Sequence, residues 1–127
     1  MTEKFELIVD KVDNIENKEN VFFCTPERIN SLKVVSKDSF FKATIKHCPI
    51  KYLTGFNLKS LYNSLRPGAS ATIFIDQPVL VMQDYDSQTI QANATYGGFT
   101  KIKTSSASML NEALGTKIDT ITVILTK

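Results

Sequence analysis

An amphipathic helix that runs into a proline–glycine break and then a buried strand is the feature that most limits the fold of this chain. Apolar side chains recur at spacings of three and four and make one helix face, formed by Leu58, Leu61, Tyr62 and Leu65. Asn57 can cap this helix, and Arg66-Pro67-Gly68 is expected to end it, because proline cannot continue a helix and glycine accepts a left-handed turn. Residues 70–76 then form the strongest predicted strand.

Strands and helices alternate along the rest of the chain. Apolar and β-branched runs predict strands at 5–9, 21–24, 39–48, 70–76, 99–104 and 118–125. Capping residues and helical spacing predict helices at 26–32, 57–65, 86–96 and 108–114, while 10–20 is predicted to be a solvated loop. No repeat or low-complexity linker interrupts this order. Residues 1–127 are therefore expected to form a single α/β domain.

Composition excludes several classes of protein. The net charge is +2, and the basic and acidic residues are interspersed, so no footprint for nucleic acid is evident. No apolar run reaches the roughly 20 residues that span a bilayer, and the first residues do not resemble a secretory signal. We expect a cytoplasmic protein without a membrane span.

The metal-binding and reactive residue types do not form a recognisable site. Cys24 and Cys48 are far apart and make no Cys-x-x-Cys pair, so both are expected to pack as small apolar side chains. His47 and Cys48 are adjacent, and adjacent strand residues point to opposite faces. The sequence therefore predicts neither a metal site nor a catalytic pair here.

Two aromatic pairs are the candidate interaction residues. The two pairs are Phe22, Phe23 and Phe40, Phe41. Within each pair, one ring should face one side of the sheet and the second ring the other side. A sheet face without covering helices would leave its rings available to a protein partner. Burial of both rings is the alternative.

Some polar residues have a structural and a functional interpretation. Asp76 ends the strongest predicted strand, where α/β domains place site residues, although turn chemistry is the commoner role. Asp84 and Asp86 are too few for a calcium loop and suit a helix start. The serines at 105, 106 and 108 favour the start of a helix as the first interpretation and a phosphorylation site as the second.

Two turns carry a resemblance to a known family. Leu65-Arg66-Pro67-Gly68 resembles the turn after an amphipathic helix in class I S-adenosylmethionine-dependent methyltransferases, and Gly97-Gly98-Phe99 resembles a later turn of that family. The resemblance implies a Rossmann-like methyltransferase-type α/β sheet with helices on both faces and a reduced helix complement. The layout is most similar to the N-terminal domain of anamorsin, an iron–sulfur assembly factor.

Departures from the family motifs decide the expected function. The family's first strand runs into a Gly-x-Gly-x-Gly loop, and its second strand ends in an acidic residue that holds the ribose. Here the first strand leads into Asp10-Lys11-Val12, and the second ends at Cys24-Thr25. We therefore expect no cofactor, no catalytic residues and no enzyme activity.

The leading hypothesis is a non-catalytic scaffold, either an anamorsin-like assembly-factor domain or a structural subunit. The resemblance implies protein partners, either a diflavin reductase or a large multi-subunit assembly. Cluster-binding cysteines like those of anamorsin's C-terminal domain are absent from the sequence. The alternative is a small S-adenosylmethionine-dependent methyltransferase with an atypical pocket, which the later turns and Asp76 favour.

Overall fold

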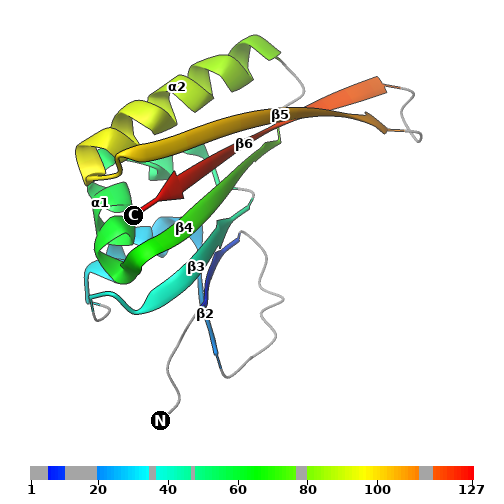
Figure 1. Ribbon diagram of the computed structural model, residues 1–127. Helices are drawn as coiled ribbons and strands as arrows, with labels where there is room; N and C mark the ends of the chain where they lie inside the picture. The colour runs from blue at the N-terminus through cyan, green and yellow to red at the C-terminus, as the bar shows by residue number, and fades with distance from the viewer. Residues whose placement is uncertain (1–5, 11–19, 35–36, 47, 77–79, 112–115) are drawn as a thin grey trace.

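The computed structural model describes residues 6–10, 20–34, 37–46, 48–76, 80–111 and 116–127. They build one six-stranded sheet with helical segments between strands (Figure 1). The strands are β1 (Glu6–Val9), β2 (Val21–Cys24), β3 (Phe40–Ile45), β4 (Leu65–Asp76), β5 (Lys101–Asn111) and β6 (Thr116–Thr126). The helical segments are the 3-10 helices η1 (Pro26–Val34) and η2 (Ile50–Tyr52) and the α-helices α1 (Gly55–Ser64) and α2 (Leu80–Gly97).

The order of the strands in the sheet is β2-β1-β3-β4-β6-β5. The strands β1 to β4 run parallel to one another, while β6 runs antiparallel to both of its neighbours, β4 and β5. The chain moves from β1 to β2 on one side and then returns to place β3 on the other side, so the strand order reverses at β1. In open α/β sheets, such a reversal leaves a crevice at the carboxyl ends of the strands.

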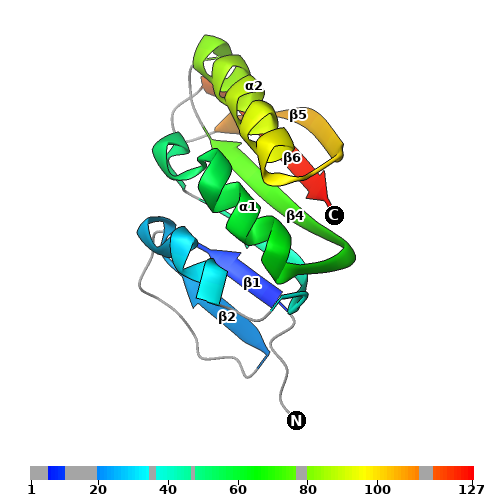
Figure 2. The same cartoon turned by 90° about the vertical axis from the view of Figure 1, so that its left-hand side faces the viewer.

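The helical segments of the described part lie on one face of the sheet (Figure 2). Residues paired across neighbouring strands share a face, and Leu7, Ala43 and Ala71 form one such fully buried row beneath the helices. The predicted Rossmann-like α/β class is confirmed. The predicted cover on both faces is not what the described helices provide, because each of them packs on the same side.

α1 has the predicted apolar face but a different cap. Leu58 and Leu61 are fully buried, as their spacing predicts. The cap is Thr54, whose Oγ1 accepts a hydrogen bond from the Asn57 backbone N–H at 3.2 Å. The Asn57 side chain instead donates to the Tyr52 carbonyl at 2.7 Å. The prediction of Asn57 as the cap was wrong because the helix begins three residues earlier, after Thr54.

The helix ends before Arg66-Pro67-Gly68, as predicted, but the following strand begins earlier than predicted, because β4 starts at Leu65 directly after α1 and includes these residues. Gly68 has φ +85, the left-handed conformation expected of it. Its N–H donates to the Lys127 carbonyl at 2.9 Å, and the Lys127 N–H donates to the Ala69 carbonyl at 2.9 Å. Pairing with the end of β6 thus turns a local break into the start of a strand.

In the second half, the predicted helix at 86–96 is confirmed and begins earlier, at Leu80. The predicted helix at 108–114 is wrong, since β5 continues to Asn111 and residues 112–115 lie outside the described part. The serines at 105, 106 and 108 therefore lie in a strand. β5 pairs with β6 from Lys101 opposite Thr126 to Asn111 opposite Thr116, and this ladder outweighs the local helix signals.

In the first half, β1 and β2 agree with the predicted strands, whereas β3 ends at Ile45, three residues before the predicted end. The predicted helix at 26–32 is a 3-10 helix. Most of the predicted loop at 10–20 lies outside the described residues, as does His47. Among the helices of the described part, none has the length and apolar character needed to cross a bilayer.

Candidate functional site at the carboxyl edge of the sheet

The carboxyl ends of the parallel strands meet at one edge, on either side of β1. There the Asp10 N–H donates to the Cys24 carbonyl at 3.2 Å, so the ends of β1 and β2 are joined. The Lys46 N–H donates to the Val9 carbonyl at 2.8 Å, which joins the end of β1 to the end of β3. Asp10, Cys24 and Lys46 are thereby fixed next to one another at the point where the strand order reverses. We take this edge as the candidate site.

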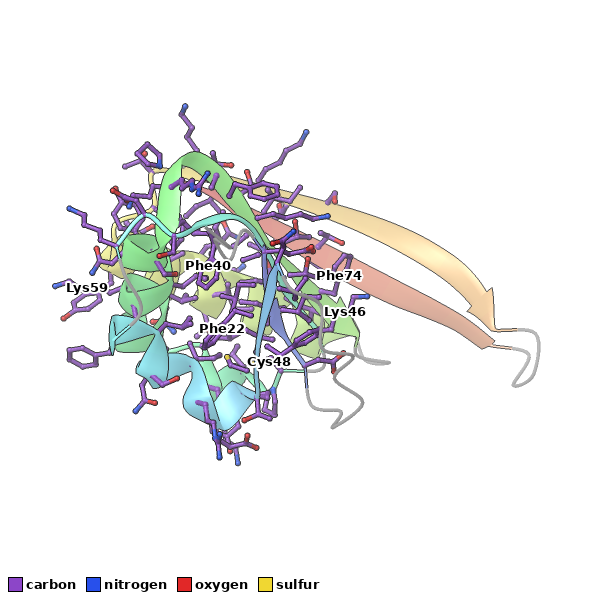
Figure 3. All side chains as sticks on the ribbon, turned by 90° about the horizontal axis from the view of Figure 1, so that it is seen from below. Phe22, Phe40, Lys46, Cys48, Lys59 and Phe74 are labelled. Atoms are coloured by element: carbon purple, nitrogen blue, oxygen red, sulfur yellow. The ribbon has the colours of Figure 1, made fainter. Side chains whose placement is uncertain are left out.

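A cation and an aromatic ring lie together at this edge. The exposed Lys46 has its Nζ 5.9 Å from the ring centroid of Phe74 on β4, and Figure 3 shows the two side chains pointing toward each other. Asp10 contributes a half-buried carboxylate from β1. The edge therefore carries both signs of charge beside an apolar ring, a combination suited to a polar ligand with an aromatic part.

The two cysteines lie near this edge as neutral thiols. Burial raises the pKa of Cys24 to about 11, which the positive charge of Arg28 partly offsets. Burial, with a smaller contribution from the nearby Cys24 and Glu27, raises the pKa of Cys48 to about 12. Both cysteines pack with the apolar core, as predicted. Among the described residues, no group of three or more His, Cys, Asp and Glu side chains could hold a metal ion.

The raised thiol pKa values predict a pH-dependent stability. The unfolded thiols have a pKa of about 9, so the folded chain holds these protons more tightly, and stability is lost as pH rises from 9 toward 11. The free energy of unfolding, measured with urea at pH 8 and at pH 10, should fall between these pH values by on the order of 1 kcal/mol more for the natural chain than for a Cys24→Ala/Cys48→Ala variant. Equal losses in both proteins would contradict this prediction.

The four predicted interaction residues differ in burial and in the contacts they make. Phe22 and Phe40 lie on the helical side, with ring centroids 5.9 Å apart, and Phe40 is fully buried (Figure 3). Phe23 pairs with Ile8 on the opposite face, and Phe41 is 51% exposed. The alternation predicted for Phe22 and Phe23 is confirmed by their pairing, while Phe40 and Phe41 differ in burial at a register irregularity of β3; the rings of Phe22 and Phe40 pack with the core. An interaction role for Phe23 or Phe41 stays a prediction.

The remaining candidates do not all lie at this edge, and the strongest new ones escaped sequence reasoning. Asp76 ends β4, a strand parallel to β3, so its backbone lies at the same carboxyl edge, whereas Asp84 and Asp86 lie within α2; the side chains of these aspartates are outside the described part. Asp10 and Lys46 were not selected from the sequence, because Lys46 was assigned to the interior of a strand at 39–48. Only the true end of β3 at Ile45 reveals that Lys46 lies at the edge.

Solved structures similar to this chain share one kind of fold. A methyltransferase from Archaeoglobus fulgidus matches with a TM-score of 0.66 and 12% identity over 99% of this chain and 87% of its own. A methyltransferase from Methanosarcina mazei matches with a TM-score of 0.62 and 13% identity over 98% of this chain and 82% of its own. One from Thermotoga maritima matches with a TM-score of 0.60 and 12% identity over 100% of this chain and 84% of its own. Each is described as S-adenosylmethionine-dependent. No family model matches the chain, and no curated protein matches it significantly.

These comparisons identify the fold as that of S-adenosylmethionine-dependent methyltransferases, which confirms the coarse resemblance. The finer resemblance to anamorsin is not shown. The prediction that the chain is not an enzyme is contradicted, because the proteins that share its fold over nearly its whole length are enzymes. That prediction relied on residues 11–14 to fill the pocket, and these lie outside the described part.

Proposed function

We propose that the chain is a methyltransferase domain that binds S-adenosylmethionine at the carboxyl edge of its sheet. The observation that carries the proposal is the reversal of strand order at β1, which places Asp10 and Lys46 at the crevice of a fold shared with such enzymes. The contacts must differ from those of the usual motif, since the sequence has neither the glycine-rich loop nor the acidic end of the second strand.

The charges at this edge match the methionyl part of the ligand. Lys46 would hold its carboxylate, and Asp10 would accept hydrogen bonds from its ammonium group or from the ribose hydroxyls. Phe74 would add an apolar wall beside Lys46. The ligand supplies an electrophilic methyl group on its sulfonium, whereas the residues of this chain bind and orient it. The two thiols are neutral at physiological pH and are not expected to act as nucleophiles.

Calorimetry and thermal unfolding with S-adenosylmethionine test this proposal. Binding to the folded chain alone should raise its stability by about 2.7 kcal/mol when the ligand is at about 100 times its Kd. Lys46→Met should weaken binding about tenfold or more, because it removes the cation that meets the carboxylate. The absence of saturable binding to the natural chain would refute the proposed function.

A matched variant controls for charge. Lys101 is also exposed, but it pairs with Thr126, which pairs in turn with Ser70 near the start of β4, so it lies toward the opposite edge of the sheet. Lys101→Met removes the same charge and should leave the Kd unchanged. If the two variants weaken binding equally, the effect comes from net charge and the ligand is not held by Lys46.

A further inference from the structure

Two exposed aromatic side chains meet on the outer surface of the helical layer. Within the described part, the exposed large hydrophobic side chains are Phe41, Phe56 and Tyr96, with Phe56 73% and Tyr96 64% exposed. Phe56 lies in the first turn of α1 and Tyr96 in the last turn of α2, yet their rings meet edge to face with centroids 5.9 Å apart. Exposed aromatic rings that gather from two elements are typical of binding surfaces.

The pair is held in place by the backbone beneath it. The Tyr96 ring covers Gly55, where an added Cβ would come within 2.5 Å of Tyr96 Cδ1. Close by, the Asn93 side chain donates to the Leu53 carbonyl at 2.8 Å, which ties α2 to the segment that precedes α1. Because the rings are already ordered, a partner would not have to immobilise them, which lowers the entropic cost of association.

The helix stretches that carry the pair hold little charge. Lys59 is the one charged residue in the stretches 55–64 and 87–97, although charged residues make up 22% of the chain. The exposed positions in these stretches, which we call the outer face, are Phe56, Lys59, Asn63, Gln88, Ala92, Thr95 and Tyr96. Loss of charge together with aromatic enrichment is the composition of an interface core, whereas a solvated helix face normally carries many charges.

We propose that the outer face is the contact surface of a homodimer, in which α1 and α2 of one chain pack on the same helices of a second copy. In a two-fold symmetric contact the same patch supplies both sides, so a patch rich in one sign of charge would repel its own copy, and the outer face carries only the charge of Lys59. Amide and hydroxyl groups such as those of Gln88 and Thr95 both donate and accept hydrogen bonds, so they can pair with themselves. A strongly charged partner would find almost no complementary charge here.

The size of the face sets the expected strength. The stretches 55–64 and 87–97 have 10 and 11 residues, which correspond to lengths of about 15 and 16 Å, and two packed helices are about 20 Å wide. The strip is therefore roughly 300 Å² in plan, below the roughly 800 Å² per partner of a standard stable interface. We expect a reversible dimer with a micromolar rather than nanomolar Kd.

Sedimentation equilibrium at about 10 µM and about 300 µM tests the proposal, because a weak dimer dissociates in this range. The average mass should rise with concentration from near 14.2 kDa toward twice that value. Phe56→Glu should remain a monomer at both concentrations. It should fold normally, because an acidic residue in the first turn of α1 suits the helix dipole. Tyr96→Arg should also be monomeric, and it should fold normally because a basic residue suits the dipole at the end of α2.

Phe41→Glu is the matched control, since Phe41 is likewise an exposed aromatic but lies on β3. This variant should dimerise like the natural chain. A natural chain that stays monomeric at about 300 µM would overturn the proposal. Dissociation by Phe41→Glu, or persistence of the dimer in Phe56→Glu, would show that another surface makes the contact. None of these outcomes depends on ligand binding, so the dimer and the methyltransferase proposal stand or fall separately.

Discussion

Replacing Phe40 by alanine is expected to lower the free energy of unfolding by about 3–5 kcal/mol, the largest loss of any change considered for this chain. Phe40 is fully buried on the helical side of β3, and its ring packs against that of Phe22, with the centroids 5.9 Å apart. Removal of the ring leaves a cavity and takes away a partner of Phe22. Urea unfolding followed by circular dichroism measures the loss.

The neighbouring residue provides the control for this prediction. Phe41 is 51% exposed, so Phe41→Ala should change the free energy of unfolding by less than about 1 kcal/mol. The contrast tests the assignment of faces as well as burial, because a one-residue shift of β3 would exchange the two rings. Comparable losses in the two variants would show that the register of β3 is wrong.

Gly97→Ala is expected to cost about 3 kcal/mol, at the upper end of what overpacking usually costs. Gly97 ends α2 where that helix comes closest to α1: an added Cβ would lie 2.8 Å from the Lys59 backbone nitrogen and 2.9 Å from the Leu58 carbonyl carbon. Real Cβ atoms do not approach backbone atoms so closely. Since backbone cannot turn aside as a side chain can, the two helices would have to separate. Thermal and urea unfolding measure the effect.

Gly68→Ala separates crowding from backbone strain. Gly68 has φ +85, but an added Cβ would meet no atom within 4 Å. Gly68→Ala should therefore lower the free energy of unfolding only through the strain of a left-handed conformation, by about 1–2 kcal/mol. If Gly97→Ala costs no more than Gly68→Ala, the close contact between α1 and α2 is not as tight as the structure shows.

The sequence predicted elements well where local chemistry and the fold agree. The apolar face of α1 and the first two strands follow from side-chain spacing and composition, and each was confirmed. The helix predicted at 108–114 failed for the opposite reason. Its serine start and glycine end are local signals, while β5 is stabilised by hydrogen bonds to β6, whose partners are not visible in the segment itself.

The candidate site was harder to predict, because it depends on the order of the strands rather than on any motif. Asp10 and Lys46 are far apart in the sequence, and they meet only because β1 lies between β2 and β3. A pattern of apolar residues predicts that strands exist but not which strands are neighbours. The missing glycine loop was visible in the sequence, and it led to the wrong prediction of an inactive protein, since a motif describes only one way of building a site.

Because the described helices form a single layer, alternate residues of β4 differ strongly in how well they should tolerate substitution. Ile73 lies beneath the helices and is 1% exposed, whereas its neighbour Thr72 pairs with Thr44 and Ile124 on the side that these helices leave uncovered. Evolution can therefore vary alternate residues of this strand almost independently. Changes in surface chemistry would accumulate on the side away from the described helices, while the buried row stays fixed in size and shape.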